Sequence, residues 1–147
     1  MYEYEYVRYL NLPQIPQSIL DSLNMNLDDY EKKSVPLETY VWTDSFNEEI
    51  NRWCRENICS TVYWGFQIID GGVAVHKDVG TLTKLNYIIL PGGDNVVTEF
   101  YKEDKTTIAS SVIIEPNRWH ILKADSYHSV KNMDPGKKRF SVTGRIF

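Results

Sequence analysis

From Thr61 to Phe147 the chain consists of short apolar segments separated by turns, and this pattern limits the possible folds more than any other feature. The segments are rich in β-branched and aromatic residues, as β-strands are. Turn sequences such as Asp70-Gly71-Gly72 separate them. We count eight such segments without a helical one between them: TVYWGFQII, VAVH, KLNYIIL, VVTEFY, SSVIIE, RWHIL, YHSV and RFSVTGRIF. This order favours a mainly β, antiparallel sandwich or barrel over a parallel βαβ sheet, and among these we expect a jelly roll.

The first 60 residues follow a different pattern. Alternation over residues 2 to 7 predicts a strand, and apolar spacing over residues 17 to 24 predicts a helix. A second helix is expected to begin at Ser45, with Glu48 completing a capping box and Phe46 on its buried face. We expect one domain over residues 1–147, in which residues 1–60 support a jelly-roll core at 61–147 and the helices cover an outer sheet face.

Composition narrows the class of protein further. The 147 residues are 42% hydrophobic, enough for one buried core, and the net charge of −4 provides no evidence for nucleic-acid binding. Two cysteines, Cys54 and Cys59, are too few for a disulfide framework, which favours a reducing compartment. The first residues lack the pattern of a secretory signal, and no apolar stretch approaches the length of a membrane span. We therefore expect a cytoplasmic protein that has no membrane partner.

Two of the three histidines form a candidate metal site with one aspartate. His76 and Asp78 are two residues apart, so in an extended segment their side chains project from the same face. His128 is on a later predicted strand and can supply a third ligand. Two histidines and one carboxylate leave open positions on iron, as in non-haem Fe(II) oxygenases. Zinc hydrolases use similar ligands, but they require no organic cosubstrate.

The last predicted strand carries a candidate binding site for an acidic cosubstrate. Alternation places Arg139, Ser141, Thr143 and Arg145 on one face of this strand. An arginine that faces inward needs a partner, and its guanidinium can bind a carboxylate with two hydrogen bonds. A dicarboxylic 2-oxo acid could chelate iron with one end and bind Arg139 and Ser141 with the other.

The order of these residues resembles that of a known enzyme family. His76-Lys77-Asp78, then His128, then Arg139-Phe140-Ser141 is similar to the His-x-Asp…His…Arg-x-Ser pattern of 2-oxoglutarate and Fe(II)-dependent dioxygenases. KLNYIIL and GGDNVVTEFY resemble segments of the prolyl-hydroxylase-like branch, and the likeness extends from about Tyr63 to Phe147. The resemblance implies a double-stranded β-helix that binds Fe(II) as its metal cofactor and uses 2-oxoglutarate and O2 as cosubstrates.

Further roles follow from the resemblance alone. A tyrosine commonly supports the far carboxylate of 2-oxoglutarate in this branch; Tyr87 is the preferred match, and Tyr63 and Tyr101 remain alternatives. Arg145 is an alternative to Arg139. Asp78 argues against the halogenase branch, in which the corresponding residue is small.

The predicted function is hydroxylation of an unidentified small-molecule or peptide substrate. His120 is predicted to be structural because no acidic residue lies two positions away. Two alternatives remain: a cupin-like metal enzyme that uses no 2-oxo acid, and a non-catalytic jelly-roll module. The oligomeric state has no signature in the sequence.

Overall fold

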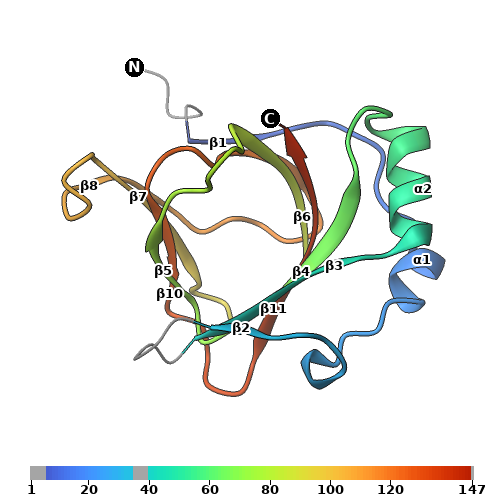
Figure 1. The fold of residues 1–147 in the computed structure, drawn as a ribbon, viewed down its shortest axis with the longest axis horizontal. Helices are drawn as coiled ribbons and strands as arrows, with labels where there is room; N and C mark the ends of the chain where they lie inside the picture. The colour runs from blue at the N-terminus through green and yellow to red at the C-terminus, as the bar shows by residue number, and fades with distance from the viewer. Residues whose placement is uncertain (1–5, 35–39, 147) are drawn as a thin grey trace.

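The computed structural model describes residues 6–34 and 40–146, and within these ranges the chain is mainly β. Two short α-helices, α1 (Gln17–Asp21) and α2 (Glu48–Asn57), and a 3₁₀ turn at Leu27–Asp29 precede most of the strands (Figure 1). Most of the strand predicted at residues 2 to 7 lies outside the described ranges, and the strand seen there is β1 (Val7–Tyr9).

The strands form two antiparallel sheets. The larger sheet contains β1, β2 (Lys33–Ser34), β3 (Val41–Phe46), β4 (Trp64–Asp70), β6 (Thr83–Pro91), β9 (Trp119–Lys123) and β11 (Lys138–Ile146), in the order β1-β9-β6-β11-β4-β3-β2. The smaller sheet contains β5 (Val73–His76), β7 (Val97–Tyr101), β8 (Ile108–Val112) and β10 (His128–Lys131), in the order β5-β10-β7-β8. From β4 onward the chain therefore crosses repeatedly from one sheet to the other.

All eight strands predicted after Thr61 are present as β4 to β11. Their bounds differ from the predicted segments by a few residues, most clearly at β8, which was expected at residues 110–115. The observed strand ends at Val112, the last residue paired with β7, because Val112 lies opposite Thr98 and the following residues leave the ladder. Ile114 contributes to the core without being part of a strand.

Alternation along the large sheet separates an outer face from an inner one. Trp64, Phe66, Phe140 and Val142 point outward and pack in one core with residues of both helices, including Leu20, Ile50 and Cys54. The helices lie on this outer side of the sheet, as the sequence predicted (Figure 1). The residues between these outer ones along the same strands point inward, toward the smaller sheet.

The start of α2 differs from the prediction. Ser45 is not its N-cap, because it belongs to β3, where it lies opposite Phe66 of β4. The N-cap is Asn47, whose side-chain oxygen accepts a hydrogen bond from the Ile50 amide at 3.0 Å. Phe46 is consequently exposed rather than buried, whereas Ile50 and Cys54 of α2 are buried.

Two smaller expectations concern the cysteines and membrane spans. Both Cys54 and Cys59 are free thiols, in agreement with the absence of a disulfide framework. Within residues 6–34 and 40–146, no helix is both long and apolar enough to cross a membrane.

Candidate metal centre

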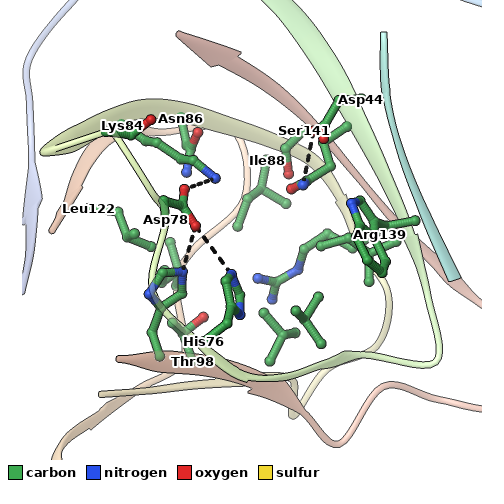
Figure 2. Close-up of a pocket in the computed structure, with 18 of the residues that line it drawn as sticks. Asp44, His76, Asp78, Lys84, Asn86, Ile88, Thr98, Leu122, Arg139 and Ser141 are labelled. Atoms are coloured by element: carbon green, nitrogen blue, oxygen red, sulfur yellow. Dashed lines mark hydrogen bonds and ion pairs between the residues drawn. The ribbon is translucent and has the colours of Figure 1, made fainter. Parts of the chain in front are cut away.

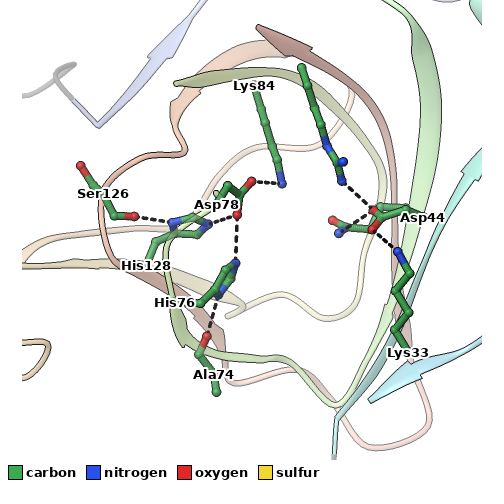
Figure 3. A network of polar contacts seen from close by, with 10 residues as sticks. Lys33, Asp44, Ala74, His76, Asp78, Lys84, Ser126 and His128 are labelled. Atoms are coloured by element: carbon green, nitrogen blue, oxygen red, sulfur yellow. Dashed lines mark hydrogen bonds and ion pairs between the residues drawn. The ribbon is translucent and has the colours of Figure 1, made fainter. Parts of the chain in front are cut away.

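His76, Asp78 and His128 come together at one end of the smaller sheet. His76 ends β5 and His128 begins β10, and the two residues are directly opposite each other in the antiparallel pair. Asp78 follows β5, and its Oδ1 atom is 3.2 Å from His76 Nε2 and 3.8 Å from His128 Nε2 (Figure 3). One potential ligand atom from each residue lies within 4.8 Å of the others. The three residues are thus positioned to bind a metal ion.

Backbone hydrogen bonds orient both imidazoles for this purpose. His76 Nδ1 is 2.8 Å from the Ala74 carbonyl oxygen, and His128 Nδ1 is 2.7 Å from that of Ser126 (Figure 3). When each Nδ1–H donates to its carbonyl, the lone pair of each Nε2 points toward Asp78. Histidine ligands of metals are typically oriented by such a contact of the other ring nitrogen.

The electrostatic environment keeps the ligand atoms in the forms that metals bind. Burial lowers the pKa of His128 to about 4, helped by the neighbouring His76, so this imidazole is neutral at pH 7. Burial alone would raise the pKa of Asp78, but its contact with His76 and the charge of Lys84 outweigh burial and hold that pKa well below its usual range. A neutral imidazole and a carboxylate are available without a prior loss of protons.

The candidate metal site opens into a cavity of about 380 Å³ between the two sheets. The large sheet contributes the inward-facing residues of β6 and β11, which include Asn86, Ile88, Arg139 and Ser141 (Figure 2). The predicted metal ligands and the predicted cosubstrate ligands Arg139 and Ser141 therefore line the same cavity.

Arg139 is a buried cation that is only partly bonded. It is 5% exposed, and its Nε donates a hydrogen bond to the Pro91 carbonyl oxygen at 3.1 Å. Its Nη2 is buried without a hydrogen-bond partner, and burial lowers the pKa of the guanidinium to about 10. A buried donor without a partner is costly, so this atom is suited to an acceptor on a bound ligand.

Arg139 is one of several cavity residues that have a buried polar atom without a hydrogen-bond partner. Among the described residues, five buried side-chain atoms have no hydrogen-bond partner, and four belong to residues that line this cavity. These four are Asn86 Oδ1, Thr98 Oγ1, His120 Nδ1 and Arg139 Nη2. Because these atoms are concentrated in one place, the cavity offers several hydrogen-bonding groups to a polar ligand or to ordered water.

Arg145, the alternative to Arg139, also lines the cavity but has a partner. Its Nη2 is 3.4 Å from Asp44 Oδ1, and its side chain is 42% exposed. Asp44 also contacts Lys33 and Gln67. Because a solvated, paired arginine has less need of a ligand, the geometry favours Arg139 as the carboxylate-binding residue.

The structure does not bring Tyr87 to the cavity. Lys84, Asn86 and Ile88 of β6 line it, so the intervening Tyr87 points to the opposite face, where its ring lies 5.1 Å from that of Trp119. The other two tyrosines, Tyr63 and Tyr101, are also absent from the lining. None of the three tyrosines named from the sequence is therefore placed to contact a ligand in this cavity, whereas Tyr40, which was not named, is part of the lining.

His120 and Lys84 are among the lining residues that were not predicted from the sequence as part of the site. His120 on β9 is fully buried, and burial lowers its pKa to about 4. A backbone contact with Arg118 partly opposes this shift, and the positive charge of Arg139 adds to it. Lys84 Nζ lies 2.5 Å from Asp78 Oδ2. The available signal was alternation, since Lys84 shares its face of β6 with Asn86 and Ile88.

The comparisons with known proteins give structural likenesses but no match in sequence. No family model matches the sequence, and no curated protein was found to be similar to it. An oxidoreductase of the 2OG-Fe(II) oxygenase family from Burkholderia pseudomallei resembles it over 78% of this chain and 71% of that one, with 8% sequence identity and a TM-score of 0.49. A likeness this low does not show membership of that family.

Proposed function

We propose that this chain is a non-haem Fe(II) oxygenase that uses 2-oxoglutarate to hydroxylate a substrate. The observation that carries the proposal is a single cavity with two distinct binding groups. At one place His76, Asp78 and His128 offer two nitrogens and an oxygen, and at another Arg139 offers an unpaired buried donor. A ligand with a metal-chelating end and a carboxylate end satisfies both groups.

The fold that we propose is the double-stranded β-helix. From β4 onward the chain crosses between the two sheets at every step except from β7 to β8, so that β4, β6, β9 and β11 lie in one sheet and β5, β7, β8 and β10 in the other. Such an arrangement, with the binding residues between the sheets, is what a jelly roll produces.

The residues present fit an iron ion by the chemistry of their donors. Two imidazoles and a carboxylate form the facial set of non-haem Fe(II) oxygenases, and both imidazoles have the backbone contact expected of ligands. Bound Fe(II) would supply the oxygen chemistry, by which 2-oxoglutarate, O2 and a substrate C–H give succinate, CO2 and a C–OH group.

The protein would contribute binding, orientation and exclusion of water. Arg139 Nη2 would bind the far carboxylate of the cosubstrate, with the Ser141 hydroxyl as a second donor from the same strand face. Ile88, Leu122 and Val130 provide apolar walls between the polar groups. The cosubstrate would thus be held across the cavity from the large sheet to the metal ligands.

The sharpest test compares the two arginines of β11. With Fe(II) bound under anaerobic conditions, Arg139→Ala is expected to raise the dissociation constant of 2-oxoglutarate at least about tenfold, because each charged hydrogen bond contributes about 1.5–3 kcal/mol. Arg145→Ala should change it little. The measurement is titration of the visible charge-transfer band, followed by succinate release under air.

Several outcomes would contradict parts of the proposal. Loss of binding in Arg145→Ala alone would exchange the roles of the two arginines. Binding of Fe(II) without any response to 2-oxoglutarate would favour a cupin-like metal enzyme that uses no 2-oxo acid. Full Fe(II) binding by His76→Ala or His128→Ala would remove those residues from the metal site.

A further inference from the structure

Lys84 is a buried cation directly behind the candidate metal site. Its side chain is 11% exposed, and it enters the cavity from β6 between Leu122 of β9 and Arg145 of β11, its neighbours in the sheet. Lysine is rarely buried unless its ammonium has a charged partner, because desolvation of the charge is costly. The partner here is Asp78 (Figure 2).

The two oxygens of Asp78 have different neighbours. Oδ1 faces the Nε2 atoms of His76 and His128 at 3.2 and 3.8 Å. Oδ2 points to the other side and lies 2.5 Å from Lys84 Nζ (Figure 3). An ammonium has three donors and no lone pair, so it can hold the carboxylate but cannot itself become a ligand.

We propose that Lys84 is a positioning residue that restricts Asp78 to one ligand oxygen and so keeps a coordination position free for an anionic chelator. This inference rests on the metal site of the proposed function. A carboxylate with two accessible oxygens can bind a metal through both of them, which would occupy one more position. The Lys84 ammonium competes for Oδ2 and prevents this.

The positive charge of Lys84 also favours the binding of an anionic chelator at the metal. Without a metal, the charges of Lys84 and Asp78 cancel, so a divalent ion gives this part of the cavity a net positive charge, to which Arg139 adds. Because the cavity is largely buried, these charges interact more strongly than in water. Lys84 therefore weakens the binding of the metal ion and strengthens the binding of a small dianion at that ion.

Lys84 is thus expected to weaken metal binding but to strengthen dianion binding, and these opposite effects make the proposal testable. Lys84→Met removes the charge and keeps the length of the side chain. We expect this variant to bind Co(II) at least about tenfold more tightly than the unchanged protein, and to bind oxalate at the Co(II) site at least about tenfold more weakly. The absorption spectrum of bound Co(II) should also change, because the number of protein ligand atoms changes.

A matched control is available on the smaller sheet. Lys131 is also paired with a carboxylate, that of Glu99 at 3.0 Å, but it is half-exposed and does not line the cavity. Lys131→Met should leave both affinities and the Co(II) spectrum unchanged. Lys84→Arg keeps a charged donor for Oδ2 and should restore both affinities toward those of the unchanged protein.

The possible results separate this inference from the proposed function. Weaker Co(II) binding in Lys84→Met would overturn the inference, because a merely structural lysine would have that effect. If Lys84→Met does not fold, Lys84→Gln, which keeps a neutral donor, replaces it with the same expected signs. Failure of 2-oxoglutarate to bind while the Co(II) and oxalate results hold would overturn the proposed function alone. Absence of Co(II) binding in the unchanged protein would overturn both.

Discussion

At the scale of single residues, the cavity contains two buried cations in different situations. Lys84 has a full charge partner in Asp78, whereas Arg139 has one backbone acceptor and one buried donor without a partner. An unpaired buried donor lowers stability unless a ligand completes it. Arg139 is therefore the residue whose environment is most improved by a bound carboxylate.

His120 leads to a prediction about pH. Its pKa is about 4 in the folded chain and about 6.5 when exposed, so the unfolded chain binds the proton more readily between these values. The contribution of His120 to the free energy of unfolding is therefore fully present above pH 6.5 and is lost as the pH falls toward 4. The loss attributable to His120 is about 2 kcal/mol between pH 7 and pH 5. Urea unfolding of the metal-free protein at both pH values measures it.

The control for this prediction is His120→Gln, which cannot titrate. The free energy of unfolding of this variant should differ less between pH 7 and pH 5, although its value at pH 7 can also change. The remaining difference is expected to come in part from His128, whose pKa is also lowered to about 4. An unchanged difference in His120→Gln would show that His120 is not neutral and buried as described.

At the scale of elements, the inward faces of β6 and β11 bring the cavity residues together. Alternation of side chains makes Lys84, Asn86 and Ile88 neighbours of Ser141 and Arg145 across one strand pair. The same alternation sends Tyr87 and Val142 into the core beneath the helices. Each of the two strands thus contributes to the core with one face and lines the cavity with the other.

The start of α2 gives a prediction at this scale. Asn47→Ala removes the side-chain acceptor of the Ile50 amide and should lower the free energy of unfolding by about 1 kcal/mol. Ser45→Ala should have a smaller effect, within about 0.5 kcal/mol, because Ser45 belongs to β3 and does not cap the helix. Urea unfolding at pH 7 compares the two variants. A larger loss from Ser45→Ala would indicate that the helix begins earlier than in the structure.

At the scale of the whole molecule, the proposed ligands connect the two sheets. The proposed metal ligands belong to β5, β10 and the segment after β5, while Arg139 belongs to β11 in the other sheet. A metal ion alone would tie together parts of the smaller sheet. A chelated 2-oxo acid would extend this connection to the larger sheet.

Binding should therefore stabilise the fold in two steps. Mn(II), a redox-stable substitute for Fe(II), at 100 times its dissociation constant should raise the free energy of unfolding by about 2.7 kcal/mol, and 2-oxoglutarate should add a further increment. His128→Ala should lose both effects, and Arg139→Ala should lose most of the second. Thermal unfolding measures each step. Full stabilisation of His128→Ala by Mn(II) would place the metal elsewhere.

The local pattern of the sequence determined much of this molecule. Strand positions after Thr61 followed from alternation and turn residues, because both depend on neighbouring residues. The same-face relation of His76 and Asp78, and of Arg139 and Ser141, followed from the two-residue period of a strand. These relations are local, so no knowledge of the distant chain was needed.

Only the tertiary structure decided which face of each strand points inward and what lies opposite it. Parity predicts that Tyr87 and Lys84 face opposite ways, but the packing of the helices on one face of the large sheet determines that Lys84 enters the cavity. Pairing with β4 kept Ser45 in a strand despite its capping pattern. The meeting of His76 with His128, and of Asp78 with Lys84, depends on sheet register and the approach of the two sheets, which are interactions between residues far apart in the chain.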